Sequence, residues 1–188
     1  FFDKALKQTV GMSFSNQHFS DNNPVDEAHP MEYMLSRFIG STNQLDFQNT
    51  YITSEFLTLV AGAETLVESA NSDFFQESSF GPFESDFADR SATTNSYYAE
   101  AQTAFFRQLF TSAGLRYDDH SRSGSEVTWR IAPAFLVPDT DTRFFTTVGT
   151  GFKSPSLYQL YSSYGNEELK PERSVGIDAG VEQRFFDR

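Results

Sequence analysis

Cysteine is absent from this 188-residue sequence, which excludes a disulfide framework, thiolate zinc sites and a cysteine nucleophile. Positive charge is scarce as well, because 14 Lys and Arg stand against 26 Asp and Glu and give a net charge of -12. A chain this acidic has no basic stripe with which to neutralise phosphates, so we expect no nucleic-acid partner. No apolar run in the sequence approaches the roughly 20 residues of a membrane-spanning helix, so we expect no helical anchor either.

The sequence also lacks the features of a natural N-terminus. It opens on Phe1 and Phe2, with no initiator Met, no basic segment and no apolar signal segment. We therefore interpret it as a segment of a longer protein whose targeting signal lies outside these residues.

Aromatic residues, in contrast, are abundant: the chain has 21 Phe and 8 Tyr although its mean hydropathy is negative. Apolar and polar residues alternate with period 2 along much of the chain, whereas no long stretch has the spacing of an amphipathic helix. This pattern predicts an all-β fold. We expect eight strands, at about 5–18, 33–52, 56–68, 96–106, 109–118, 126–137, 142–152 and 172–185.

The connections between the expected strands alternate in length. Three are short turns, and the others are longer polar loops. The turns are 53–55, 107–108 and 138–141, and the loops are 19–32, 69–95, 119–125 and 153–171. Short turns at one end and long loops at the other are typical of an up-and-down transmembrane β-barrel.

The two faces of the expected strands differ in charge. One face, which includes Leu57, Tyr97, Leu109, Phe144 and Val175, has no charged residue. The charged residues of these strands all fall on the opposite face, and they are Glu64, Glu100, Arg116, Arg130, Asp178, Glu182 and Arg184. The alternation fits a barrel with a lipid-facing surface, but a soluble β-sandwich alternates in the same way.

Aromatic residues at the strand ends favour the barrel. The pairs that bracket the uncharged face are Tyr97 with Phe105, Trp129 with Phe135, and Phe144 with Phe152. At a tilt near 40°, eight residues cover roughly 20 Å of height, close to the apolar band between the aromatic girdles of outer-membrane barrels. Pro133 interrupts one of these strands, and we expect a local irregularity there because proline donates no ladder hydrogen bond.

A compound motif near the C-terminal end resembles TonB-dependent outer-membrane receptors. Its residues are Gly151, Phe152, Lys153, Pro155, Leu160, Tyr161, Gly165, Asn166, Leu169, Pro171, Glu172 and Ser174. The stretch 113–130, with Ala-Gly-Leu-Arg-Tyr-Asp-Asp-His-Ser and a following Thr-Trp-Arg, is similar to the cobalamin-receptor subgroup of that family. The resemblance covers about residues 95–188.

The resemblance implies a 22-stranded barrel in the bacterial outer membrane, closed by an N-terminal plug and coupled to the TonB complex through an N-terminal peptide. Neither plug nor peptide is recognisable here, and the last residues, from Phe185 to Arg188, lack the terminal aromatic that the family implies. We therefore expect residues 1–188 to be a partial barrel domain without the plug. The implied function is transport and not catalysis, with cobalamin as the first choice of ligand and a ferric siderophore as the alternative.

The motif offers ligand-binding candidates as well as scaffold residues. The glycines and the prolines Pro155 and Pro171 have direct backbone explanations, so we interpret them as residues that shape a loop. Aromatic and amide side chains on a loop can bind a large ligand, and the candidates are Tyr158, Tyr161, Tyr164 and Asn166. Packing of the loop against itself is the open alternative.

Other chemistry finds less support, and we expect no catalytic residue, metal site or cofactor. The acidic loop with Asp21, Asn22, Asn23, Asp26 and Glu27 lacks the glycine and glutamate register of an EF-hand. The stretch Asp118-Asp119-His120-Ser121 is contiguous, whereas a catalytic triad is assembled in space. The three histidines, His18, His29 and His120, have no metal-ligand spacing.

Two rival classes remain open from the sequence. A complete eight-stranded barrel, structural or hydrolytic, would need bulky inward residues, whereas many expected inward positions are Gly or Ala. A soluble sugar-binding sandwich would need no detergent.

Overall fold

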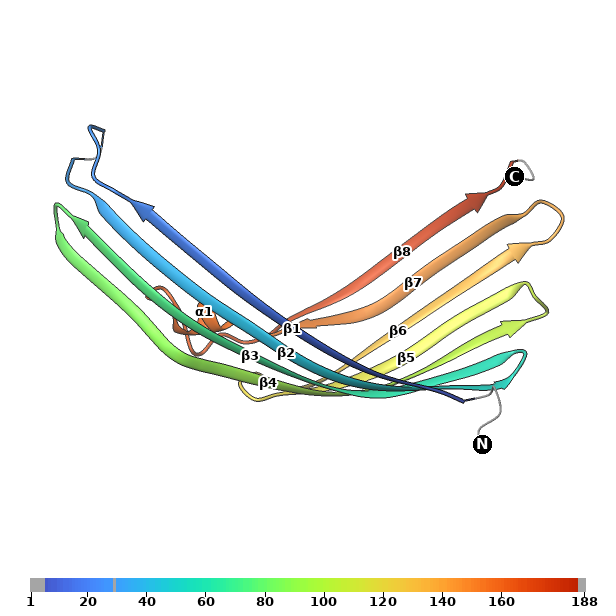
Figure 1. Ribbon diagram of the computed structural model, residues 1–188. Helices are drawn as coiled ribbons and strands as arrows, with labels where there is room; N and C mark the ends of the chain where they lie inside the picture. Colours follow the sequence, from blue (N-terminus) through green and yellow to red (C-terminus); the bar gives the residue numbers. More distant parts are fainter. Residues whose placement is uncertain (1–5, 29, 186–188) are drawn as a thin grey trace.

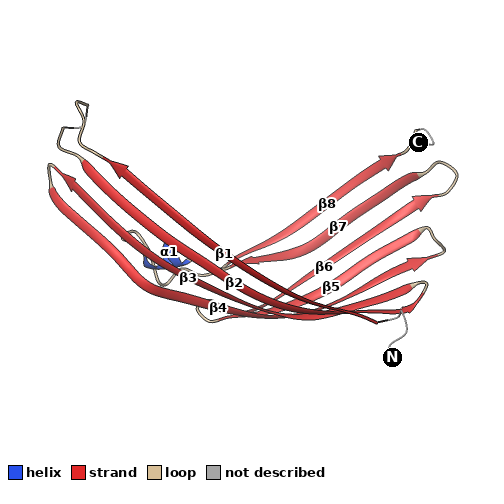
Figure 2. Cartoon of the chain, viewed as in Figure 1, coloured by secondary structure: helices blue, strands red, loops and turns tan. Residues whose placement is uncertain are grey.

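The computed structural model describes residues 6–28 and 30–185, which form one eight-stranded antiparallel sheet and one short helix (Figures 1 and 2). The elements are β1 (Leu6–Asn23), β2 (Tyr33–Ser54), β3 (Leu57–Ser78), β4 (Gly81–Phe105), β5 (Leu109–His120), β6 (Gly124–Val137), β7 (Thr142–Lys153), α1 (Leu157–Tyr161) and β8 (Glu172–Gln183). The expected all-β class and eight strands are confirmed. Ala5, where the first strand was expected to begin, and His29 lie outside the described residues.

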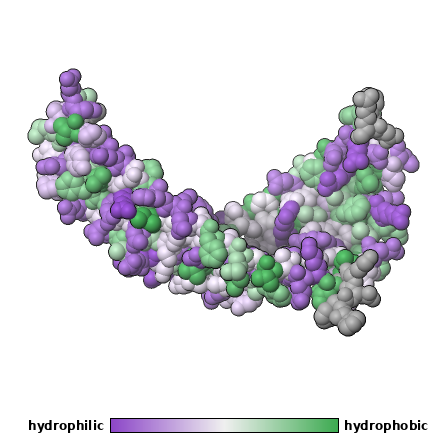
Figure 3. Space-filling model, in the orientation of Figure 1, coloured by the Kyte–Doolittle hydropathy of each residue, from purple (hydrophilic) through white to green (hydrophobic). Residues whose placement is uncertain are grey.

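Each strand pairs with the next one along the chain, in the order β1 to β8. The sheet curves into a trough, with β1 and β8 as its two rims and α1 on its concave side (Figure 1). The space-filling view shows the sheet as a curved band along which hydrophilic and hydrophobic residues are interspersed (Figure 3). Within the described residues β1 and β8 do not pair with each other, so this sheet is not a closed eight-stranded barrel.

Connections alternate between the two ends of the sheet, as expected, but two of the four predicted longer loops are short: residues 79–80 join β3 to β4, and residues 121–123 join β5 to β6. Residues 69–95 form a long hairpin instead, because β3 runs to Ser78 and β4 begins at Gly81. The Ser and Asp content of this stretch suggested a solvated loop, whereas cross-strand hydrogen bonds satisfy its backbone. Gly81, at φ 101°, gives the tip its left-handed conformation, followed by Pro82.

The strands of the two halves differ greatly in length. Strands β2, β3 and β4 have 22, 22 and 25 residues, whereas β5, β7 and β8 have 12 each. The end of β5, His120, pairs with Thr94 of β4, so everything in β4 before Thr94 continues beyond β5. We call residues 15–23, 33–43, 67–78 and 81–93 the extension.

Register places the uncharged residues of neighbouring strands side by side. Ala61 pairs with Ala99, Ala99 with Leu115, and Leu115 with Trp129. We call this surface the outer face and the opposite one the inner face. The predicted charged set falls on the inner face, except that Arg184 follows the last residue of β8.

Aromatic residues flank the apolar part of the outer face. Tyr97 pairs with Tyr117 towards the loop end, Phe135 pairs with Phe144 towards the turn end, and the rings of Phe56 and Phe105 stack at 6.4 Å. At the expected irregularity, pairing of β6 with β7 passes from Ile131–Val148 directly to Ala134–Phe145, skipping Pro133 without a change of register. In the described part of the chain no helix is long and apolar enough to cross a membrane.

A β-bulge in β4 marks the middle of the extension. Ala70 pairs with Arg90 but Ser72 pairs with Phe87, so Asn71 faces two residues of β4. One of them, Asp89, has a left-handed φ of 52°, and its N–H donates to Asn71 Oδ1 at 2.6 Å. The extra residue changes which side chains of β4 face inward: even-numbered ones after the bulge and odd-numbered ones before it.

Candidate functional site

The connection between β7 and β8, residues 154–171, folds over the inner face of the extension. It carries α1, whose N-cap Ser156 accepts a hydrogen bond from the N–H of Gln159, while the Gln159 side chain accepts one from the N–H of Ser156. Leu157 and Leu160 are 8% and 6% exposed, and Leu157 packs in a cluster with Ala70, Phe87 and Ala92 of the sheet. This burial fixes the loop to the wall of the trough.

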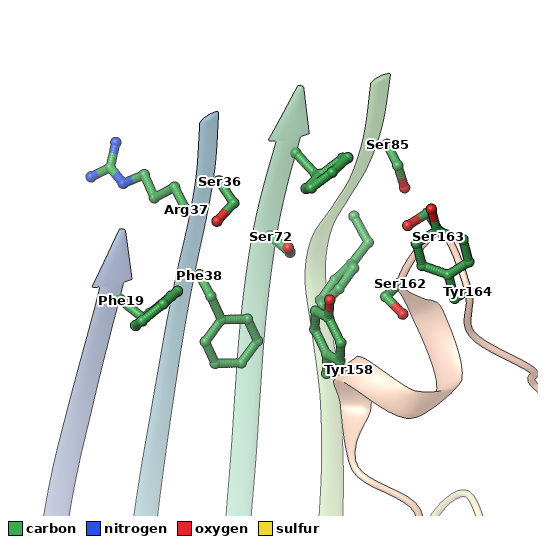
Figure 4. Close-up of a pocket in the computed structure, with 12 residues that line it drawn as sticks. Phe19, Ser36, Arg37, Phe38, Ser72, Ser85, Tyr158, Ser162, Ser163 and Tyr164 are labelled. Carbon is green, nitrogen blue, oxygen red and sulfur yellow. The ribbon is translucent and has the colours of Figure 1, made fainter. Parts of the chain in front are cut away.

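A pocket of 380 Å³ opens between the extension and the residues that follow α1 (Figure 4). We call it the distal pocket. Its lining residues are Phe19, Ser36, Arg37, Phe38, Ser72, Phe74, Ser85, Phe87, Tyr158, Ser162, Ser163 and Tyr164. Six aromatic rings and five serines therefore form most of its surface, a combination suited to ring stacking with hydrogen bonds from hydroxyl groups.

Arg37 is the single charged residue among those lining residues, and it belongs to the other side of β2. It pairs with Asp73 in the outward-facing register, next to the inward pair of Phe38 and Ser72. Figure 4 shows its guanidinium group extending away from Phe38 and Tyr158. The interior of the distal pocket is therefore aromatic and uncharged.

The four predicted ligand-binding residues fall into two groups. Tyr158 and Tyr164 line the distal pocket, and Tyr164 is 82% exposed. Tyr161 packs against the sheet: its ring lies 6.3 Å from that of Phe87 and has the Arg90 guanidinium carbon 4.4 Å from its centre. These contacts make Tyr161 an anchor of the loop.

Asn166 belongs with the anchoring residues. Its side-chain oxygen accepts a hydrogen bond from the N–H of Glu168 at 2.9 Å, and its own N–H donates to the carbonyl of Gln159. The preceding Gly165 lies so close to α1 that an added Cβ would be 2.7 Å from the carbonyl oxygen of Leu160. A side chain at position 165 would therefore displace the end of the helix.

The remaining motif residues frame the base of the loop. Gly151 pairs with Ser174, Phe152 with Arg173 and Lys153 with Glu172, with 4.0 Å between the Lys153 ammonium and the Glu172 carboxylate. Pro155 and Pro171 lie at the two exits from the sheet, and Leu169, which is partly exposed, precedes the second exit. These positions match the loop-shaping role expected for the glycines and prolines.

A polar network lies on the inner face between the extension and the turn end of the sheet. Arg116 donates to Glu64, Asp118 and Ser96, at 2.8, 2.8 and 2.7 Å, and Ser96 donates to Asp118 at 2.6 Å. Gln44 donates to the second oxygen of Glu64 at 2.9 Å. These side chains join four neighbouring strands, β2 to β5, and they lie on the face on which the charged residues were expected.

His120 closes the short β5–β6 loop, three residues beyond the aromatic pair of Tyr97 and Tyr117. It is 4% exposed, and its Nδ1 accepts hydrogen bonds from the N–H groups of Arg122 and Ser123 at 3.2 and 3.1 Å. Burial lowers the pKa of His120 below its usual 6.5, the Arg122 charge lowers it further, and Glu68 opposes both. The fold therefore favours the neutral imidazole.

The contiguous stretch that contains Asp, His and Ser does not form a catalytic arrangement. Asp118 accepts from Arg116 and Ser96, and Ser121 Oγ accepts from the N–H of Thr93 at 3.0 Å. Together with the backbone bonds of His120, these contacts give Asp118, His120 and Ser121 structural partners. Among residues 6–28 and 30–185, no three His, Asp or Glu side chains are grouped so that they could hold a metal ion.

Comparison with known families identifies the architecture. The family model for the TonB dependent receptor-like β-barrel matches residues 2–188. The chain belongs to this family. TonB-dependent receptors are transport proteins, and the curved antiparallel sheet with alternating turns and loops is part of their barrel.

Individual relatives agree with this assignment. The chain is 29% identical over 164 residues to the vitamin B12 transporter BtuB of Vibrio vulnificus (strain YJ016). The matched region covers 86% of this chain and 25% of that protein. Its fold matches the copper transporter OprC with a TM-score of 0.77 at 14% identity, covering 98% of this chain and 34% of OprC. The ferric yersiniabactin uptake receptor FyuA from Yersinia pestis matches with a TM-score of 0.74 at 12% identity, covering all of this chain and 32% of FyuA.

The chain thus spans about a quarter of the vitamin B12 transporter and a third of the two solved TonB-dependent receptors. At 12–14% identity, these two structures establish the fold of the barrel segment and not its ligand.

Proposed function

We propose that this chain is part of the barrel domain of an active transporter in the bacterial outer membrane that captures a large metal chelate outside the cell. In this proposal the plug and the TonB-binding peptide belong to the rest of the protein, and lipid surrounds the outer face. The chain contributes binding and a path, and no covalent chemistry.

The observation that carries the proposal is the distal pocket. A loop of the family motif folds over the inner face of the extension, and there it brings Tyr158 and Tyr164 opposite Phe19 and Phe38. The pocket lies at the loop end of the sheet, beyond the aromatic residues that flank the apolar band. An aromatic pocket at this place suits first capture of a ligand from outside.

Cobalamin is our first choice of ligand, because the pocket interior is aromatic and directs no charge at its occupant. A neutral corrinoid can stack on these rings and accept hydrogen bonds from serine hydroxyl groups. An anionic ferric chelate would enter a partly dehydrated site without a cationic partner, which is unfavourable. The relationship to a vitamin B12 transporter, at 29% identity, supports the same choice.

A ferric siderophore is the alternative, and two arginines give it a specific basis. Arg90 and Arg122 have their guanidinium carbons 4.4 and 5.8 Å from the centre of the Tyr161 ring. Movement of α1 would release both cations towards an anionic ligand.

Equilibrium binding of radiolabelled cyanocobalamin to outer membranes containing the full-length receptor tests the proposal. We expect the double variant Tyr158→Ala/Tyr164→Ala to weaken binding at least tenfold, about 1.4 kcal/mol. The matched control is Tyr33→Ala, because Tyr33 lies at the same end of the sheet but packs against Phe75 on the outer face, with ring centres 6.0 Å apart. Equal affinity in the double variant and the control would contradict ligand binding by the distal pocket. Binding of a ferric catecholate in place of cyanocobalamin would favour the alternative ligand.

A further inference from the structure

A second pocket lies on the other side of α1, nearer the apolar band. We call it the proximal pocket; it has a volume of 410 Å³. Its lining residues are Ser15, Gln17, Phe38, Gly40, Ser41, Thr42, Glu68, Ser69, Ala70, Ser156, Leu157 and Tyr158. On β3 it is lined by residues 68–70, whereas the distal pocket reaches Ser72 and Phe74, so the two pockets follow one another along the strands.

Two residues are common to both linings, and they touch each other. Phe38 comes from β2 and Tyr158 from α1, and their rings meet edge to face, with centroids 6.0 Å apart and planes at 79°. Figure 4 shows both rings at the base of the distal pocket. The pair therefore forms the partition between the pockets.

The two pockets differ in chemistry. The distal one is lined by six aromatic rings, whereas the proximal one has aromatic rings only in the partition. Its other inward-facing lining residues include the Ser15 and Thr42 hydroxyls, the Gln17 amide and the Glu68 carboxylate. Such a surface accepts hydrogen bonds from amide or other N–H donors and repels anions.

Tyr158 can move without the helix that carries it. Its neighbours in α1, Leu157 and Leu160, are both buried, and Leu157 packs against the sheet, whereas Tyr158 is 50% exposed. Rotation about the side-chain bonds of an exposed residue takes picoseconds to nanoseconds and needs no backbone change. The partition can therefore open while α1 stays in place.

We propose that the proximal pocket is a second binding subsite, for a neutral ligand portion that carries amide groups, and that ligand enters it from the distal pocket when Tyr158 turns away from Phe38. The inference rests on the proposed function and adds a sequence of two bound positions to it. Glu68 would accept hydrogen bonds from the ligand's N–H groups in the second position.

Dissociation kinetics of radiolabelled cyanocobalamin from the full-length receptor in outer membranes test this inference, with excess unlabelled cyanocobalamin added at time zero. We expect two phases for the natural protein, a fast one from the distal pocket and a slow one from the proximal pocket. Ser15→Trp fills the proximal pocket from β1 and should leave only the fast phase. The matched control Asn16→Trp places the same side chain on the opposite face of the strand, and it should retain both phases.

A second pair of variants tests the partition itself. Tyr158→Ala removes one of the two rings and should accelerate the slow phase at least tenfold, whereas Tyr158→Phe retains the ring and should change it less than twofold. A single phase in the natural protein, or a slow phase that persists in Ser15→Trp, would overturn the second subsite while leaving capture intact. Failure of the natural protein to bind cyanocobalamin would overturn cobalamin as the ligand and this inference together.

Discussion

The two halves of the sheet use their inner faces differently. In the extension of β1–β4 the inner face is a small apolar core, in which Ala70, Phe87 and Ala92 pack with Leu157 of the loop. Over the shorter β5–β8 the inner face instead has close-packed glycines, such as Gly149 and Gly180, and paired charges such as Arg143 with Glu182. The difference teaches that the extension has its own side-chain core, whereas the shorter half depends on backbone pairing and on what surrounds the sheet.

The largest expected effect is the loss of stability when a charge is placed on the outer face. It should be large in the apolar band and small in the extension. Ala113→Arg places a charge between Ala101 and Ile131, and we expect it to reduce the free energy of unfolding of the full-length receptor in lipid vesicles by about 2–4 kcal/mol. Ile39→Arg makes the same type of change on the outer face of the extension and should cost less than about 0.5 kcal/mol. Equal costs, measured by urea titration, would mean that the apolar band has been misplaced.

A smaller effect is expected where the loop packs on the extension. Leu160→Ala removes a side chain that is 6% exposed and should lower the local stability of α1 by about 2 kcal/mol. Hydrogen exchange of amides 157–161 should then accelerate at least tenfold, with no change in β5–β8. Glu167→Ala, on the exposed part of the same loop, is the control. Unchanged exchange in Leu160→Ala would show that α1 is held by other contacts.

The β-bulge should contribute about half as much to local stability as the Leu160 side chain does. Asn71→Ala removes the acceptor of the Asp89 N–H and should destabilise the distal hairpin by about 1 kcal/mol. Asp89→Gly should act in the opposite direction, since glycine adopts the left-handed φ of this position without steric cost. Hydrogen exchange at residues 72–87 measures both effects. A change of the same sign in the two variants would contradict the assigned role of the bulge.

The smallest effect concerns pH and the β5–β6 loop. Because the pKa of His120 is lowered in the fold, its contribution to stability is complete above about pH 6.5 and is lost as the pH falls through the lower folded value. Protonation puts a hydrogen on Nδ1, which then cannot accept from Arg122 and Ser123. Amide exchange of residues 121–123, corrected for intrinsic rates, should rise on acidification. A rise of equal size in His120→Asn, which retains an acceptor that does not titrate in this range, would assign the effect to another group.

Strand number and the two faces of the sheet could be predicted because alternation with period 2 is strong where one face is apolar and the other polar. The outward row from Ala99 through Leu115 to Trp129 has this property. The same signal is weak in the extension, where serines and acidic residues occupy both faces and the bulge at Asp89 changes the parity of β4. The dipeptide Gly81-Pro82 was the available sign of a hairpin tip.

The candidate site could be predicted only as far as the loop that carries it. Tyrosine content indicated the loop, but which tyrosines face a pocket depends on how α1 is seated. Leu157 packs on the sheet, while Tyr158 of the same turn lines the pockets and the ring of Tyr161 lies beside Arg90. The partner ring Phe38 lies about 120 residues away in the sequence, and no local pattern connects it with Tyr158.

The bulge in β4 gives the wall of the distal pocket one position at which the chain can lose a residue. Beyond the bulge, Ser85 and Phe87 line the pocket, while Glu84 and Asp86 face outward. Deletion of Ala88 would leave Asn71 opposite Asp89 alone and Ser72 still opposite Phe87, so the pairing would become regular and the same side chains would face the pocket. At this position, therefore, the loss of one residue would remove the bulge and leave the aromatic surface of the pocket unchanged.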